Sequence, residues 1–214
     1  FMGVGAFEII EDTYKDIAVN YYVEKKYAKY AKDIFGNTPE MMQFFSDKLG
    51  VAFPWNKYSQ IVVRDYVSGA MENTTAVVHG EQAYQMPGQL IDENKQENTI
   101  AHELFHHWFG DLVTSESWSN LTLNESFANY SEYLWQAYKY GEEAAEMHLY
   151  ENTKLYLDGQ EAAKKLVRFK YLDKEDMFDL VSYNKGGAIL HMLRNYVGDA
   201  AFFASLKMYL TDYQ

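Results

Sequence analysis

The apolar positions near the start of the chain predict two helices. Over residues 19–35, apolar and aromatic side chains recur at helical spacing among lysines, and Gly36 follows as a stop signal. A second helix is expected over residues 38–49, because Thr38 suits the N-cap and Pro39 suits the first helical position. The pattern therefore predicts two consecutive helices separated by a glycine.

Further along, two segments have the composition of strands. Residues 59–67 read SQIVVRDYV and residues 73–79 read NTTAVVH, and both are rich in β-branched side chains. From about Glu93 onward the pattern changes to long helical segments, which are separated by Gly110, Gly141, Gly159 and Gly198. Strand signals are therefore confined to the first half of the chain.

Together these patterns predict an α+β fold in a single domain of residues 1–214. A small mixed lobe with a sheet is expected over about residues 1–92, and a mainly helical lobe over about residues 93–214. Apolar residues make up 48% of the chain, which includes 19 Tyr and 13 Phe, so a packed core is expected rather than a disordered chain.

Charge and cysteine content narrow the range of partners and sites. The chain has 19 basic and 31 acidic residues, giving a formal net charge of −12, so nucleic acid is not an expected partner. There is no cysteine, which excludes disulfides. Any metal site must therefore be built from histidine and carboxylate side chains.

The sequence contains no run of about 18 apolar residues, and its first residues lack the features of a signal peptide. Membrane insertion by this segment is therefore not expected. Because the chain begins with Phe1 rather than methionine, we expect it to be a fragment of a longer multidomain protein. Signals elsewhere in that protein would not be visible, so the cellular compartment stays open.

Two histidines have the spacing of a metal site. His102 and His106 lie four residues apart in the sequence HELFH, so on a helix they project from one face and can share one ion. Between them, Glu103 can act as general base on a metal-bound water. The alternative interpretation of this motif alone is a helix with two structural histidines.

A third candidate ligand is Glu125, which follows His106 by 19 positions at the start of another helical segment. Two histidines and one glutamate leave the fourth position of a zinc ion open for water, which is the catalytic rather than the structural arrangement. The predicted metal site is therefore His102, His106 and Glu125, holding one Zn²⁺ ion per chain. Other divalent ions fit such ligands as well, and zinc is preferred here on ligand type.

Three ordered motifs resemble one enzyme family. They are HELFHHWFGDLVT (residues 102–114) with the following NESFA block, the GAMEN block (residues 69–73), and Tyr183-Asn184-Lys185-Gly186. Together they resemble the gluzincin zinc aminopeptidases of the aminopeptidase N and leukotriene hydrolase family. The resemblance implies a thermolysin-like metallopeptidase catalytic domain whose substrate is a peptide with a free N-terminus.

The resemblance also implies roles for single residues. Glu72 would bind the α-ammonium group of the substrate, for which a carboxylate is a suitable partner. The rest of the GAMEN block, which is Gly69, Ala70, Met71 and Asn73, would line the substrate site, with the backbone of the first two along the extended peptide and Met71 in the first side-chain pocket.

Further downstream, Tyr183 would donate a hydrogen bond to the oxyanion of the tetrahedral intermediate. Glu132 lies two helical turns after Glu125 and would hydrogen-bond a zinc-bound imidazole, with an exposed helix charge as the alternative. His107 should point away from the metal, because it is rotated by about 100° from His106. His79, His148 and His191 have no ligand spacing and are expected to be structural or solvated.

The chain departs from the family pattern at two positions of the segment LTLNESFA. Thr122 stands where the family commonly has Trp, and Ser126 stands where it commonly has Gly. The resemblance also implies a β-rich domain upstream and a helical domain downstream in the same protein. Two other functions are kept as alternatives: a thermolysin-type endopeptidase, and a non-catalytic peptide-binding relative.

Overall fold

The computed structural model of the protein describes residues 2–214 except residues 160 and 162. Its contacts divide the chain into two compact units. The first unit comprises residues 2–48 and 52–107, and the second comprises Leu49–Val51 and Trp108–Gln214. The helix that carries His102 therefore groups with the sheet, although the lobe boundary was expected earlier, near residue 92. That the whole chain forms one domain stays a prediction.

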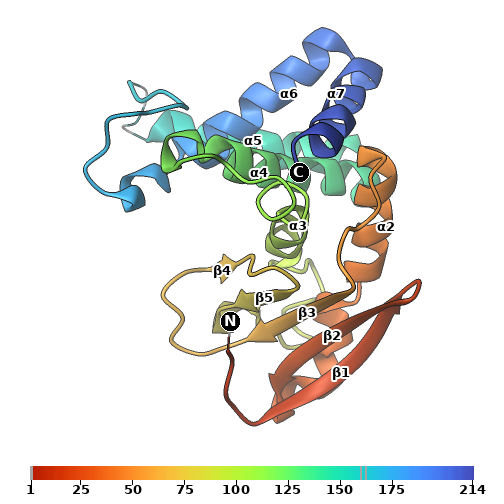
Figure 1. Ribbon diagram of the computed structural model, residues 1–214. Helices are drawn as coiled ribbons and strands as arrows, with labels where there is room; N and C mark the ends of the chain where they lie inside the picture. Colours follow the sequence, from red (N-terminus) through yellow and green to blue (C-terminus); the bar gives the residue numbers. More distant parts are fainter. Residues whose placement is uncertain (1, 160, 162) are drawn as a thin grey trace. The chain divides into compact units, whose positions relative to one another are not determined.

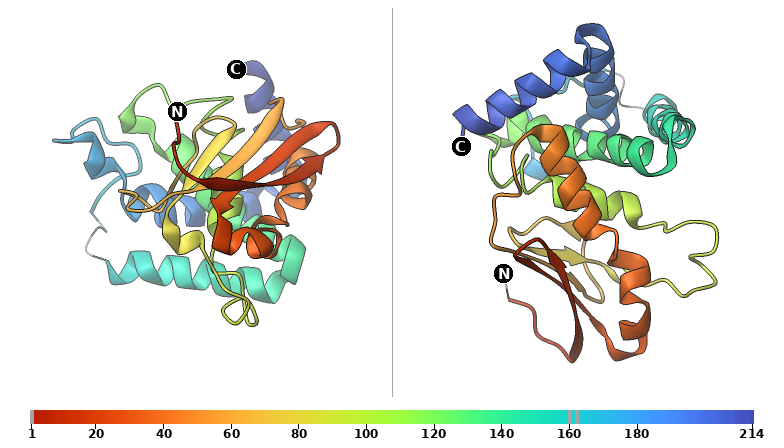
Figure 2. Two further views of the ribbon diagram at one scale, coloured as in Figure 1. Left: turned by 90° about the horizontal axis from the view of Figure 1, so that it is seen from below. Right: turned by 90° about the vertical axis from the view of Figure 1, so that its right-hand side faces the viewer.

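The first unit is built on a five-stranded mixed sheet, whose strands run side by side in the order β1-β2-β3-β5-β4 (Figure 1). The long antiparallel β1–β2 hairpin forms one edge and is visible in both views of Figure 2. β3 pairs in parallel with β2 and β5, and the short β4 pairs antiparallel with β5. The strands are β1 (Phe7–Tyr14), β2 (Ile17–Glu24), β3 (Lys57–Val62), β4 (Ala70–Met71) and β5 (Ala76–His79).

The helix predicted over residues 19–35 was wrong. Residues Ile17–Glu24 form β2, and only the 3₁₀ helix η1 (Lys25–Tyr30) and the short α1 (Ala31–Phe35) follow it. The reason is alternation: Val19, Tyr21 and Val23 are all completely buried, so one face of a half-buried strand carries the apolar residues at a period of two. The lysines that suggested an amphipathic helix belong to the segment after the strand.

The second predicted helix is confirmed as α2 (Thr38–Leu49). Thr38 is its first helical residue rather than its N-cap, and its hydroxyl donates to the carbonyl of Phe35 at 2.7 Å. α2 packs on α3 (Glu97–Phe105), where the rings of Phe45 and Phe105 meet edge to face. A short 3₁₀ helix, η2 (Glu81–Ala83), completes the regular structure of this unit.

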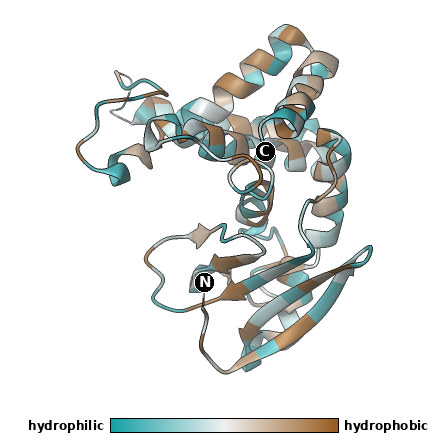
Figure 3. Cartoon of the chain, viewed as in Figure 1, coloured by the Kyte–Doolittle hydropathy of each residue, from teal (hydrophilic) through white to brown (hydrophobic). Residues whose placement is uncertain are grey.

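The second unit is helical, as predicted. Gly141 and Gly198 adopt positive φ values of 96° and 81° and separate successive helices, which is a conformation that favours glycine. Apolar and polar stretches mix along α6 and α7 (Figure 3). The helices are η3 (Trp118–Asn120), α4 (Thr122–Tyr140), α5 (Glu142–Asp158), η4 (Lys174–Met177), the π-helical turn η5 (Val181–Lys185), α6 (Gly186–Val197) and α7 (Asp199–Asp212).

The fold class is therefore α+β, with a small mixed sheet and a mainly helical remainder, as the sequence predicted. Among the helices of the described residues, none combines the length and the apolar character that crossing a bilayer requires.

Candidate metal centre

The two histidines of the HELFH motif lie together at the end of α3, with His102 in its last turn and His106 as the C-cap residue that follows it. The backbone N–H of His106 donates to the carbonyl of His102 at 3.2 Å, so the helical turn is closed between them. Their ring centroids are 4.9 Å apart, and both side chains are buried. Two imidazoles on one helix face at this separation suit a shared divalent ion, because each offers a nitrogen and needs no large movement to reach it.

The GAMEN block lies beside this helix within the first unit. Ala70 and Met71 form β4, and Glu72 follows directly. One carboxylate oxygen of Glu72, one of Glu103 and one ring nitrogen of His106 lie within 4.8 Å of one another. Two motifs that are about thirty positions apart in the chain thus meet at one place.

His107 connects the residues at the end of α3 to the segment that follows the GAMEN block. Its Nδ1 lies 3.2 Å from the carbonyl oxygen of Glu103, and its Nε2 accepts the backbone N–H of Thr75 at 2.9 Å. The acceptor role of Nε2 requires the neutral ring with the proton on Nδ1. Burial lowers the pKa of His107 to about 3, so the ring stays neutral near pH 7.

Thr75 has a strained backbone conformation at this contact. Its φ is +65°, which is uncommon and unfavourable for a β-branched residue. The sequence correctly predicted that His107 points away from a ligand position. It did not indicate the tie to Thr75, because the two residues are far apart in the chain and no spacing rule connects them.

In the second unit, Glu125 lies in the first turn of α4 and is only 4% exposed. A buried carboxylate needs a cation or hydrogen-bond donors, and the start of a helix favours its negative charge. Further along α4, Glu132 lies 3.2 Å from Nε2 of His148 on α5, and both side chains are largely buried. Glu132 is therefore not an exposed helix charge, whereas its predicted bond to a zinc-bound imidazole stays a prediction.

Tyr183 lies in the π-helical turn η5, which the sequence did not indicate. Its neighbours Ser182 and Asn184 are buried, whereas Tyr183 is partly exposed. The turn is closed by the backbone N–H of Lys185, which donates to the carbonyl of Leu180 at 2.9 Å. Single π-helical turns are rare and occur often at functional sites.

The other histidines have structural surroundings. His79 is completely buried, and its Nε2 lies 2.9 Å from the side-chain oxygen of Gln60. His191 lies 3.2 Å from the hydroxyl of Tyr130. Neither belongs to a group of potential metal ligands among the described residues.

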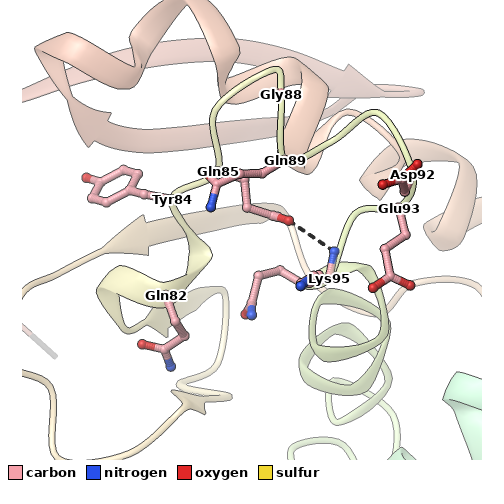
Figure 4. A pocket seen from close by; sticks show the side chains of 9 residues that line it. Gln82, Tyr84, Gln85, Gly88, Gln89, Asp92, Glu93 and Lys95 are labelled. Carbon is pink, nitrogen blue, oxygen red and sulfur yellow. Dashed lines mark hydrogen bonds between the residues drawn. The ribbon is translucent and has the colours of Figure 1, made fainter.

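A separate cavity of about 490 Å³ lies in the first unit, along the loop between β5 and α3 (Figure 4). Most of its lining residues are of polar types, and the backbone N–H of Lys95 donates to the side-chain oxygen of Gln85. None of the predicted site residues lines it. The lining residues are Gln82, Tyr84, Gln85, Gly88, Gln89, Asp92, Glu93, Lys95 and Gln96.

Comparison with known proteins gives a consistent result. Residues 34–214 match the model of the peptidase family M1 domain. The chain is 34% identical to aminopeptidase M1 of Arabidopsis thaliana over 98% of its own length and 25% of that protein, and 34% identical to aminopeptidase N of Streptomyces lividans over 96% and 26%. A probable aminopeptidase 2 of Sulfurisphaera tokodaii is 29% identical over 100% and 28%.

The chain thus spans about a quarter of the length of these curated relatives. The family match covers most of the chain and includes the HELFH motif, the NESFA block and the GAMEN block. The chain therefore belongs to peptidase family M1, the family of the gluzincin aminopeptidases related to aminopeptidase N.

Proposed function

We propose that this chain is the catalytic part of a zinc aminopeptidase that hydrolyses the N-terminal peptide bond of peptides. The observation that carries the proposal is the grouping of Glu72, Glu103 and His106 within 4.8 Å in the first unit. A carboxylate this close to the base and a candidate ligand can hold the ammonium group of a substrate, so that the first peptide bond reaches the reacting water.

The metal would be held by His102, His106 and Glu125. Two buried imidazoles on one helix face and a buried carboxylate form the donor set that zinc commonly uses in catalytic sites. When bound, a divalent ion of this kind lowers the pKa of its water and polarises the scissile carbonyl. The membership of the family supports a metal, and the identity of the ion and of its three ligands is our proposal.

The remaining roles belong to side chains of this chain. A carboxylate oxygen of Glu103 takes the proton of the attacking water and delivers it to the leaving amine. The hydroxyl of Tyr183 donates to the oxyanion that develops in the transition state. Glu132 is proposed to orient one of the ligating imidazoles.

Substrate contacts are assigned to the GAMEN block. β4 is a short edge strand, and the backbone of Gly69 and Ala70 suits an extended peptide that adds to this edge. Met71, whose side chain is 37% exposed, suits the pocket for the first side chain of the peptide, and Asn73 completes the block.

An endopeptidase of the thermolysin type would need the metal and Glu103 but no anchor for an amino group. The position of Glu72 therefore favours the aminopeptidase. Because the chain spans only part of its relatives, we also propose that a β-rich domain upstream and a helical domain downstream accompany it in the full protein.

The test is hydrolysis of a panel of aminoacyl-coumarin amides, with free and with acetylated amines, by the zinc-loaded full-length protein. Wild type should cleave only the free-amine substrates. Glu103→Gln should lower kcat by about 10²–10⁴-fold with zinc content unchanged, because it removes the general base. Glu72→Ala should raise KM for free-amine substrates.

Glu93→Gln is a matched control, because it neutralises an exposed glutamate of the loop before α3 that is outside the motifs. It should leave the kinetics unchanged. Equal cleavage of acetylated substrates would exclude an aminopeptidase in favour of an endopeptidase. No cleavage by a zinc-loaded protein would favour the non-catalytic peptide-binding relative.

A further inference from the structure

We propose that Ser126 and Thr122 are positioning residues, which hold the π-helical turn η5 so that the hydroxyl of Tyr183 keeps its place. The inference rests on the proposed function, in which Tyr183 stabilises the oxyanion. It adds two side chains of α4 that no motif assigns to the reaction.

The first observation is a relay of two hydroxyl groups. The hydroxyl of Ser126 donates to the carbonyl oxygen of Ser182 at 2.6 Å. Because Ser126 has a single hydroxyl proton and uses it there, the 2.5 Å contact with Thr122 must be a bond that Thr122 donates. Ser126 and Ser182 are both buried, so water does not compete for these bonds.

The second observation is the place at which the relay ends. The carbonyl of Ser182 belongs to the same planar peptide unit as the backbone nitrogen of Tyr183. Holding this oxygen therefore limits rotation of the peptide plane that directly precedes Tyr183. The relay acts on the backbone that orients the tyrosine.

The neighbouring residues of the turn are fixed by bonds of their own. The hydroxyl of Ser182 donates to the carbonyl of Met177 at 2.6 Å, and the side-chain amide of Asn184 donates to Asn152 at 2.7 Å. The π-helical turn is therefore held on both sides of Tyr183, and Ser126 supplies the tie from α4.

The third observation is the close fit around the hydroxyl of Ser126. A Cβ atom at Gly186 would lie only 1.8 Å from this oxygen, and one at Gly187 would lie 2.3 Å from the side-chain oxygen of Asn129. α6 begins with these two glycines, so it can approach α4 closely enough for the relay to form. Any larger residue at position 186 would displace Ser126.

Thr122 and Ser126 stand where the family commonly has Trp and Gly, and in this chain they are bonded to each other. A glycine at position 126 has no hydroxyl to donate.

The test is a double-mutant cycle in the zinc-loaded full-length protein. Ser126→Ala should lower kcat about five-fold, as loss of one buried hydrogen bond would, with KM changed less than about two-fold. In the Tyr183→Phe background the same substitution should change kcat less than about two-fold, because the hydroxyl that it positions is already absent. Thr122→Val should have a smaller effect of the same kind.

Ser131→Ala is the matched control. Ser131 is a buried serine of the same helix, and its hydroxyl donates to the carbonyl of Ala128 at 2.7 Å within α4 rather than to η5. It should cost stability without a selective loss of kcat. Hydrogen exchange of the 181–185 segment, measured in the same proteins, should speed up in Ser126→Ala and not in Ser131→Ala.

The outcomes separate this proposal from the proposed function. An equal loss of kcat by Ser126→Ala in both backgrounds would overturn the positioning role. The same conclusion would follow if hydrogen exchange of residues 181–185 were equally fast in the Ser126→Ala and Ser131→Ala proteins. A zinc-loaded parent that cleaves no aminoacyl substrate would overturn the proposed function, and this inference with it.

Discussion

The first unit and the second unit hold their candidate catalytic residues in different ways. In the first, Glu103 in α3 and His106 directly after this helix are buried. A hydrogen bond between His107 and Thr75, which has a positive φ, connects the end of α3 to the segment after the GAMEN block. In the second, Tyr183 is partly exposed in a π-helical turn that side-chain hydroxyl and amide groups hold.

This difference predicts which substitutions should cause a severe loss of activity and which should cause only a partial loss. Residues fixed by burial cannot move without a cavity or an unpaired polar group, whereas a turn held by several separate hydrogen bonds can lose one and keep the others. Direct removal of a reacting group should be severe in either unit, and removal of a supporting contact should be milder in the second.

Among substitutions in the second unit, the largest effect is expected for Tyr183→Phe. Removal of a hydrogen bond made only to the oxyanion should lower kcat by about 10²–10³-fold while KM stays nearly unchanged. Steady-state kinetics on a free-amine substrate, with zinc content as a check on the metal, would measure it. Tyr156→Phe is a control, because this tyrosine lies under the side chain of Lys185 and is not assigned to the reaction. A comparable loss of kcat in both variants would contradict the oxyanion role.

A smaller effect is expected for His107→Leu, which removes the bond between the His107 ring and the backbone N–H of Thr75 and the contact of the same ring with the carbonyl of Glu103. Loss of this alignment between Glu103 and Glu72 should lower kcat/KM for free-amine substrates by about ten-fold. His107→Gln should restore most of the activity, because a neutral amide also offers one donor and one acceptor. Kinetics of the two variants at equal zinc content provide the measurement, and equal losses would show that only the volume of the ring matters.

The sequence indicated the family and the fold class of the chain more reliably than the course of its backbone. The histidine pair was found from residue type and spacing, and the GAMEN block and Tyr183 from the resemblance to the family. The helix at residues 38–49 and the breaks at Gly141 and Gly198 were correct because their signals are local. The strand β2 was missed because lysines after it imitated an amphipathic helix, although the alternating burial of Val19, Tyr21 and Val23 has a readable period of two.

Other features had no sequence signal at all. The π-helical turn around Tyr183 depends on bonds to side chains of α4 and α5, and the bond between His107 and Thr75 joins residues 32 positions apart. Such contacts depend on tertiary packing, which overrides local preference.

The smallest expected effect concerns stability rather than activity. It tests whether burial in the first unit keeps His79 unprotonated. Burial lowers the pKa of His79 to about 3, whereas an unfolded histidine titrates near 6.5. Below pH 6.5, His79 therefore binds a proton in the unfolded chain but not in the native one. The stability that its neutral ring supplies is present above pH 6.5 and is lost as the pH falls. Between pH 7 and pH 5 the loss should be about 2 kcal/mol.

Substituting His79→Gln keeps a donor for Gln60 and removes the titrating group. Urea unfolding of both full-length proteins at pH 7 and pH 5 should show a free energy of unfolding that falls less steeply in the variant, by about the same 2 kcal/mol. Because both proteins share the metal ligands and His107, their contributions cancel in the difference. Parallel pH dependences would mean that His79 already takes up its proton in the native state, and that burial in this unit is less strict than its packing indicates.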